Sequence, residues 1–284
     1  MKRHFTAVLL VILFLLSACS TPVPIAQSPT PPAPTPISAT PVPSSPISSP
    51  TATEAPSSTP TNTPEPSPTP GPVPAFDHIA IIVMENREFG FVIGNPQMPN
   101  YNRLAEENTL LTQYYGVTHP SLPNYLAMIG GDTFGIDSDC ETCFINAPSL
   151  PDEIEAAGRT WRTYQEDLPS PCFVGSTLSY AQKHDPFIYF DPIRLDPQRC
   201  EQGVVPLSQL ETDLADGSLP DYLFIMPNLC NSGHDCDLDV VDAWLAPWVE
   251  RLQTSAAFGQ NSLIVLTWDE GQGNHGCCGA QVGG

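Results

Sequence analysis

The sequence has little positive charge. It contains 10 lysine and arginine residues against 31 aspartate and glutamate residues, which gives a formal net charge of −21. A protein that binds DNA or RNA needs a basic face that neutralises phosphates, so this composition excludes nucleic acid as a partner. The same negative charge opposes adsorption to anionic lipid head groups.

The sequence also lacks an apolar run long enough to cross a membrane. The nearly unbroken apolar stretch from Phe5 to Ala18 has 14 residues, whereas a membrane-spanning helix needs about 20. Because it follows the basic residues Lys2 and Arg3, it is typical of a signal peptide. Residues 16–19 resemble a bacterial lipobox, so residues 1–19 are predicted to be a lipoprotein signal peptide with Cys19 lipidated. The alternative is an ordinary signal peptide in which Cys19 has no role.

Residues 20–74 have almost no charged side chains and few large apolar ones. Of the 34 prolines in the chain, 19 lie here, and the charged residues are Glu54 and Glu65 alone. Such a composition cannot bury enough apolar surface to offset the entropy of ordering. We therefore expect a disordered Pro/Thr/Ser-rich linker that tethers the rest of the chain to the outer side of the bacterial cell membrane. A proline-rich ligand for a binding domain is the alternative.

Cysteine is not scarce, and its number suits an exported protein. Lipidation of Cys19 leaves eight cysteines, an even number that predicts disulfides in an oxidising compartment. Local pairing is plausible for Cys140–Cys143, Cys172–Cys200 and Cys230–Cys236, although eight cysteines allow 105 connectivities. The C-x2-C spacing of Cys140 and Cys143 leaves a zinc–thiolate site as the alternative.

Residues 75–284 have the pattern of an α/β domain. Apolar, β-rich runs predict strands at His78–Met84, Thr160–Glu166, Asp221–Met226 and Ser262–Trp268, with a weaker candidate at Thr109–Tyr115. Helical patterns lie between them, near residues 102–107, 121–129, 152–157 and 239–252, the last with Pro247 predicted to kink or split it. Alternating strands and helices predict a mostly parallel central sheet with helices on both faces.

Polar clusters follow three of these predicted strands. Glu85 and Asn86 follow the first, Asn231, His234 and Asp235 lie beyond the third, and Asp269 and Glu270 follow the last. In open parallel sheets, ligands bind outside the carboxyl ends of the strands. We therefore expect these side chains to meet at one edge of the sheet.

Ser121 opens a predicted helix and has two interpretations. As the residue before Leu122-Pro123, it fits the position of an ordinary capping serine. A helix N-terminus also presents free N–H groups that suit a phosphate, so Ser121 can instead be a nucleophile. The G-x-S-x-G elbow of serine hydrolases is absent. Activation by a metal ion is then the more natural route.

Four segments, in this order, carry a family resemblance: His78–Phe89, His119–Gly131, Thr160–Cys172 and Ser262–Gly273. Together they resemble the bacterial phosphoesterase family, which contains acid phosphatases and phospholipases C with an alkaline-phosphatase-like α/β fold. The resemblance runs from Ala75 to Gly284. Members of the family usually continue beyond this point with a further strand and helix, so the resemblance predicts that the domain is incomplete at its C-terminal side.

The resemblance also implies roles for particular residues. Ser121 matches the nucleophile, His234 and Asn124 match positions that line the phosphate pocket, and His119 and Asp235 lie nearby. The metal-binding positions are matched by Glu85, Asn86, Asp269 and Glu270. The sequence offers no partner for His184.

These roles are chemically coherent. Three carboxylates converging on one place repel one another unless a cation lies among them. Oxygen ligands favour Ca²⁺, Mg²⁺ or Mn²⁺, with Zn²⁺ as a further candidate. Such an ion would activate Ser121, and His234 would protonate the leaving alkoxide as a general acid.

The sequence therefore predicts metal-dependent hydrolysis of phosphate esters through a phosphoserine intermediate, as in acid phosphatases. The substrate would be a phosphorylated small molecule or a phospholipid, and the lipid anchor would be the protein's contact with the membrane. One alternative is a phosphodiesterase of the phospholipase C type. The other is a surface lipoprotein that binds a metal or phosphate without catalysis.

Overall fold

A computed structural model describes residues 74–273 of the chain. The predicted signal peptide, Cys19, all but the last residue of the predicted linker, and His275, Cys277 and Cys278 lie outside the described residues. Within the described range, no helix is both long and apolar enough to cross a membrane.

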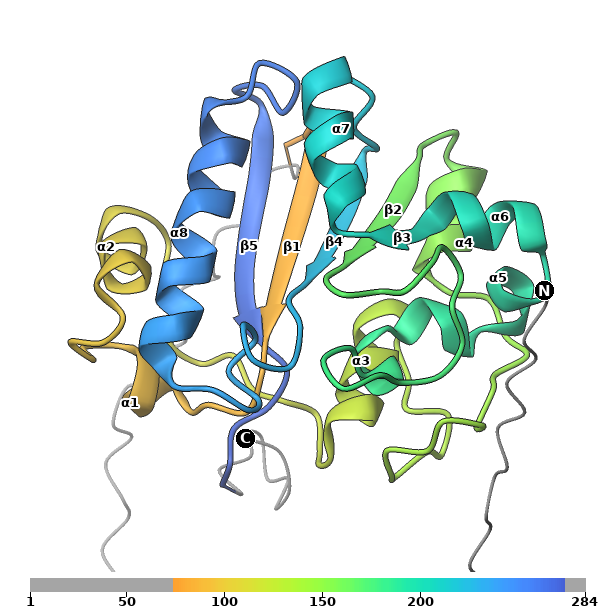
Figure 1. Cartoon of the computed structure of the whole chain (residues 1–284), viewed down its shortest axis with the longest axis horizontal. Coiled ribbons are helices and arrows are strands. Elements are labelled where there is room, and N and C mark those ends of the chain that lie inside the picture. Colours follow the sequence, from red (N-terminus) through yellow and green to blue (C-terminus); the bar gives the residue numbers. More distant parts are fainter. Residues whose placement is uncertain (1–73, 274–284) are drawn as a thin grey trace, which may run out of the picture. The chain divides into compact units, whose positions relative to one another are not determined.

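The described residues form a five-stranded sheet in the order β3-β2-β4-β1-β5, in which all neighbouring strands are parallel (Figure 1). The strands are β1 (His78–Met84), β2 (Trp161–Gln165), β3 (Val204–Pro206), β4 (Tyr222–Met226) and β5 (Ser262–Trp268). The predicted α/β class is confirmed. The weaker candidate at Thr109–Tyr115 was wrong, because those residues form an exposed loop rather than a strand. The short β3 was missed.

Two hydrophobic cores cover the two faces of the sheet, as a buried parallel sheet requires. Ala80, Ile82 and Met84 of β1 point into one core, and Val83 points into the other, with Ile79 and Ile81 packed against it. The helices divide accordingly: α2 (Pro99–Glu107), α7 (Ser208–Asp216) and α8 (Leu238–Thr254) pack on the first face.

The second face is covered by α3 (Ser121–Gly130), η2 (Pro186–Tyr189), α5 (Asp191–Arg194) and α6 (Pro197–Gly203). The remaining described helices are α1 (Phe89–Val92), α4 (Leu150–Ala156) and the 3₁₀ turn η1 (Gln182–His184). Helix α8 is continuous through Pro247, so it was not split as one reading of the sequence had it. Its apolar side, including Leu245 and Val249, is buried on both sides of the proline, which holds the helix together.

Three disulfides are present among the described residues: Cys140–Cys143, Cys172–Cys200 and Cys230–Cys236. They match the local pairs that the sequence suggested. The zinc alternative for Cys140 and Cys143 was therefore wrong, because both thiols are used in a covalent bond.

Candidate active site

The predicted polar clusters meet where β1 and β5 end, at the lower edge of the sheet in Figure 1. Met84 and Trp268 are paired at the last position of the two strands, so the residues that follow lie side by side. The backbone N–H of Asn86 donates to Asp269 Oδ1 at 3.0 Å, and the N–H of Asp269 donates to the carbonyl of Met84 at 2.9 Å. This edge thus brings Glu85, Asn86, Asp269 and Glu270 together, as expected.

The three carboxylates of this cluster are buried, with exposed fractions of 0% for Glu85, 1% for Asp269 and 6% for Glu270. Burial, and next the charge of Asp269, raise the pKa of Glu85 well above its ordinary value. Burial, followed by the charge of Glu270, raises the pKa of Asp269 to about 7. One oxygen of Asp269, Oδ2, is buried without any hydrogen-bond partner. Buried carboxylates that raise one another's pKa, one of them with an unpartnered oxygen, fit a divalent cation.

Ser121 lies against this cluster. It is the first residue of α3, and Pro120 occupies the cap position, so the interpretation of Ser121 as an N-cap was wrong. Its hydroxyl does not cap the helix because it donates to Glu270 Oε1 at 3.0 Å and lies 3.4 Å from Glu85 Oε2. The side chain is buried. A hydroxyl held by carboxylates at a helix N-terminus has the environment of an activated nucleophile.

Asn124, one turn further along α3, holds the loop that precedes the helix. Its Oδ1 accepts hydrogen bonds from the N–H groups of Val117 and Thr118, at 2.7 and 3.1 Å. Its Nδ2 donates to the carbonyls of Thr118 and Pro120 at 2.8 and 3.1 Å. Its Nδ2 also lies 3.4 Å from Glu270 Oε2, so the amide both holds the loop and borders the carboxylate cluster. Its contact with substrate stays a prediction.

His119 also faces the cluster rather than open space. Its Nδ1 is hydrogen-bonded to Glu270, and its Nε2 lies 2.8 Å from the carbonyl of Gly273. Burial alone would lower the pKa of His119, but the bonds to Gly273 and Glu270 outweigh it and raise the pKa. An imidazolium beside Glu270 stabilises the ionised carboxylate, so the structure places His119 as a partner of a predicted metal ligand.

Sequence reasoning missed two buried residues that contact Glu85. The hydroxyl of Tyr125 donates to Glu85 Oε1, and His184 Nε2 lies 3.1 Å from the same oxygen without forming a hydrogen bond. Burial, with the charge of Lys183, lowers the pKa of His184 well below its ordinary value, so its ring is neutral. Tyr125 lies four residues after Ser121, and this helical spacing was the available signal. No pattern in the sequence pointed to His184.

His234 and Asp235 approach the cluster from the loop after β4. His234 Nδ1 is hydrogen-bonded to Asp235 Oδ1 at 2.6 Å, and its Nε2 lies 3.4 Å from Lys183 Nζ. Asp235 therefore orients the histidine, and with its side chain 53% exposed it stands at the rim. The ring centroids of His234 and His184 are 5.5 Å apart.

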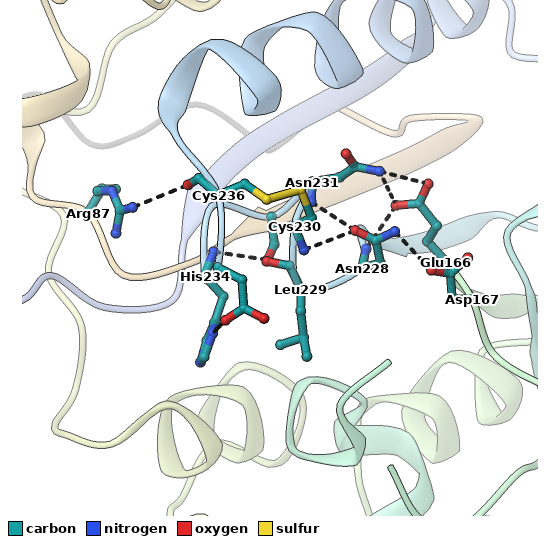
Figure 2. The surroundings of a disulfide bond; sticks show 11 residues. Arg87, Glu166, Asp167, Asn228, Leu229, Cys230, Asn231, His234 and Cys236 are labelled. Atoms are coloured by element: carbon teal, nitrogen blue, oxygen red, sulfur yellow. Dashed lines mark hydrogen bonds and ion pairs between the residues drawn. A yellow bond between two sulfur atoms is a disulfide. The ribbon is translucent and has the colours of Figure 1, made fainter. Parts of the chain in front are cut away.

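The loop that carries His234 is fixed by a disulfide and by one glutamate (Figure 2). The Cys230–Cys236 bond closes a ring of chain around His234 and Asp235. Glu166, directly after β2, accepts hydrogen bonds from Asn228 N, Asn231 Nδ2 and Trp244 Nε1, at 2.9 to 3.0 Å. The loop is thus tied both to the neighbouring strand and to α8.

A second group of ligand atoms shares Glu85 with the first. The ligand atoms of Glu85, His184 and His234 all lie within 4.8 Å of one another. Two imidazoles and a carboxylate suit a borderline ion such as Zn²⁺, whereas the set Glu85, Asn86, Asp269 and Glu270 offers oxygen to a harder ion. Glu85 is common to both sets, and it is the fully buried centre of the site.

Comparison with known proteins places these residues in context. A model of the Phosphoesterase family matches residues 95–277, a range that includes Ser121, Asn124, Asp269 and Glu270 and begins after Asn86. The chain is 37% identical over 209 residues to "Phosphatidylinositol-3-phosphatase" of Mycobacterium tuberculosis. The aligned region covers 71% of this chain and 66% of that protein.

Two fungal proteins are similar over the same region. The identity is 34% over 205 residues to "Acid phosphatase" of Aspergillus fumigatus, covering 69% of this chain and 45% of that protein. It is 35% over 207 residues to "Phosphate-repressible acid phosphatase" of Penicillium chrysogenum, covering 69% and 48%. The chain thus spans about half the length of these fungal relatives.

Proposed function

The chain belongs to the Phosphoesterase family, and on this premise we propose that it is a metal-dependent phosphatase that acts through a phosphoserine intermediate on Ser121. The observation that carries the proposal is the placement of the Ser121 hydroxyl, which lies at a helix N-terminus and 3.0 Å from Glu270 Oε1, among three buried carboxylates.

The carboxylate cluster supports the metal requirement. Glu85, Asn86, Asp269 and Glu270 are the residues that would hold a Ca²⁺, Mg²⁺ or Mn²⁺ ion, and the nearby His184 and His234 keep Zn²⁺ among the candidates. When bound, a divalent ion neutralises these carboxylates, lowers the pKa of the serine hydroxyl and polarises a phosphoryl oxygen. It also supplies positive charge to a protein whose net charge is −21.

The protein groups account for the proton movements in the first step. Ser121 Oγ forms a bond to phosphorus as the ester P–O bond breaks, and its proton passes to Glu270. His234 gives a proton to the leaving oxygen as the general acid, and Asp235 orients its ring through Nδ1. The start of α3 adds the partial positive charge of a helix N-terminus, while the N–H of Leu122 is bonded to Asp139 and Pro123 has none.

The second step reverses these transfers. Water attacks the phosphoserine, the P–Oγ bond breaks, and the proton of the water passes to His234. Glu270 returns its proton to Ser121. One ester and one water thus give one alcohol and one phosphate, and the protein is restored.

The names of the relatives favour a phosphate monoester over a phosphodiester. The mycobacterial and fungal relatives are named as phosphatases, and a phosphatase removes a terminal phosphate. We therefore take a phosphorylated small molecule, or a phospholipid with a phosphorylated head group, as the substrate class. The phospholipase C type of reaction and a non-catalytic binding role are the alternatives that the assay below decides.

We also propose that the protein acts outside the cytoplasm, attached through Cys19 to the membrane of a bacterial cell. Three disulfides in the described domain support an oxidising location. The variant Cys19→Ala should move the full chain from the membrane fraction to the soluble fraction. Unchanged membrane association of this variant would contradict the lipid anchor.

The test of the activity uses the full chain with p-nitrophenyl phosphate and with bis(p-nitrophenyl) phosphate, each with and without a metal chelator. We expect turnover of the monoester that the chelator abolishes and a divalent ion restores. Ser121→Ala should lower kcat by at least about a thousandfold, as loss of a nucleophile does in covalent catalysis. Ser208→Ala is the matched control, because Ser208 is the exposed first residue of α7. Full activity of Ser121→Ala would exclude the phosphoserine route.

A further inference from the structure

Lys183 has a place in the site that neither the sequence pattern nor the proposed mechanism uses. It is one of two lysines in the whole chain, the other being Lys2. It belongs to η1, and its Nζ donates to Asp139 Oδ2 at 2.8 Å and lies 3.4 Å from His234 Nε2. The side chain is 21% exposed, so the ammonium group lies at the mouth of the site rather than in open solvent.

Two series of neighbouring residues connect Lys183 with the proposed nucleophile Ser121. In one direction, Asp139 Oδ1 accepts a hydrogen bond from the N–H of Leu122 at 3.0 Å, next to Ser121. On the other side, Lys183 lies next to His234, whose ring lies beside that of His184. His184 lies next to Glu85, and Glu85 Oε2 is 3.4 Å from the Ser121 hydroxyl. Lys183 and Ser121 are therefore connected through neighbouring residues on both sides.

The charge of Lys183 reaches the carboxylate cluster. The pKa of Glu85 is raised mainly by burial and by Asp269, whereas the hydrogen bond from Tyr125 and the charge of Lys183 act to lower it. Arg87 also lies near the cluster, but it donates to the backbone carbonyls of Asn86 and Cys236, the latter contact being drawn in Figure 2. Lys183 differs from Arg87 because, among the described residues, its partners are side chains and not backbone carbonyls.

An ammonium group has three N–H donors. Asp139 accepts from one of them, and His234 Nε2, which donates a proton in the proposed mechanism, lies 3.4 Å away. Within residues 74–273 the ammonium contacts no other acceptor, so it can also donate to an anion. A phosphate monoester has a charge of about −1.5 to −2 at neutral pH. A diester has one ionisable oxygen fewer, so a cation beside the non-bridging oxygens stabilises the bound monoester more than the bound diester.

We propose that Lys183 binds the non-bridging phosphoryl oxygens of the substrate and sets the preference for phosphate monoesters over diesters. The proposal rests on the function proposed above, because it places the phosphoryl group in front of Ser121. Asp139 holds the ammonium in place by its ion pair, and the same carboxylate holds the N-terminus of α3 through Leu122.

The experiment compares four forms of the full chain: wild type, Lys183→Met, Lys183→Arg and the control Arg251→Met. Arg251 has the same kind of ion pair, with Glu211 at 2.6 Å, but it lies in the last turn of α8, which leads to the start of β5 and not to its end. Each form is assayed with p-nitrophenyl phosphate and bis(p-nitrophenyl) phosphate, and binding of inorganic phosphate is measured by calorimetry.

We expect Lys183→Met to lower kcat/KM for the monoester by about tenfold to a hundredfold, the range of a charge-assisted hydrogen bond. For the diester, kcat/KM should change by less than about threefold, because the diester has one negative charge fewer for Lys183 to bind. Lys183→Arg should retain most of the preference and Arg251→Met all of it. Phosphate affinity should fall in Lys183→Met to the same extent as monoester affinity.

Two results would overturn the assignment. One is an equal loss for both substrates, which indicates a structural role, and the other is no loss of monoester turnover. If the wild type hydrolyses neither substrate, the proposed function fails, and phosphate binding decides the role of Lys183 separately. In that case, equal phosphate affinity in wild type and Lys183→Met, or no phosphate binding by either, would reject the assignment of Lys183 as a phosphate-binding residue.

Discussion

The backbone N–H of Asn86 donates a hydrogen bond to Asp269 across 183 residues of sequence, at 3.0 Å. Asn86 has a positive φ of 56°, a conformation that asparagine tolerates better than most residues. Its Nδ2 donates to Glu85 Oε2 at 2.8 Å. One residue at the end of β1 therefore orients a carboxylate from each of two neighbouring strands.

Stability should fall as the pH rises when no divalent ion is bound. In the unfolded chain, Asp269 and Glu85 ionise at about pH 4, whereas burial, with Glu270, raises the pKa of Asp269 to about 7 in the folded protein. Burial, with Asp269, raises that of Glu85 also. Between these pH values the folded protein binds more protons than the unfolded chain, so the free energy of unfolding decreases from about pH 4 to about pH 7.

Thermal melts across this pH range, with and without chelator, measure the effect. A divalent ion should reduce the pH dependence because it compensates the ionised carboxylates, and Asp269→Asn should reduce it without any metal. Melting temperatures in chelator that are independent of pH, or that rise with it, would contradict this account of the cluster.

Removal of the Cys230–Cys236 disulfide should impair activity more than stability. The variant with both cysteines changed to serine loses closure of a short loop, which contributes about 2 kcal/mol, while the 28-residue separation of Cys172 and Cys200 corresponds to about 4 kcal/mol. The first loop, however, holds His234. We expect at least about a tenfold loss of kcat for the first variant, and a larger loss of stability with milder loss of kcat for the Cys172/Cys200 variant. Urea unfolding and steady-state kinetics distinguish the two patterns.

Glu166 should act as a positioning residue for His234. In Glu166→Gln, an amide N–H₂ group replaces one of two accepting oxygens: Oε2 accepts from Asn228 and Asn231, and Oε1 accepts from Asn231 and Trp244. We expect kcat to fall by about tenfold with little change in KM, because the loop loses its anchor to β2 while the phosphate-binding groups remain. Glu211→Gln, on the exposed side of α7, is the control. A change confined to the melting temperature would indicate a structural role alone.

Tyr125→Phe should weaken metal binding. The variant retains the ring, which is fully buried, but removes the hydroxyl that donates to Glu85. Loss of a hydrogen bond to a metal ligand typically lowers metal affinity by about 10- to 100-fold. Titration of the metal-free protein with Ca²⁺, Mn²⁺ or Zn²⁺ measures the affinity, and Tyr222→Phe in β4 is the matched control. Equal affinities in the two variants would place Glu85 outside the metal site.

Much of the fold could be predicted from residue patterns. The long apolar runs of β1 and β5 were predicted with the bounds that the structure has, because a run of β-favouring apolar residues is typical of a strand in a parallel sheet. Val204–Pro206 was too short to show any period. The loop at Thr109–Tyr115 was rich in β-favouring residues, but within residues 74–273 it pairs with no strand.

The site was predictable where polar residues directly follow strands. Glu85 and Asp269 belong to this group, and the parallel register brings them together. His184 and Lys183 were not predictable, because they lie in a 3₁₀ turn whose position depends on packing against α3 and η2. The hold of the Asn124 amide on the preceding loop was not predicted from the sequence, and its contact with substrate stays a prediction.

The strand order has a consequence for how the protein is made. Among the described strands, β1 comes first in the chain and its neighbour β5 comes last. One flank of β1 therefore remains open to other chains until the segment some 180 residues further along has paired with it. The carboxylate cluster is therefore completed late in folding, because Asp269 and Glu270 reach Glu85 only when β5 pairs with β1.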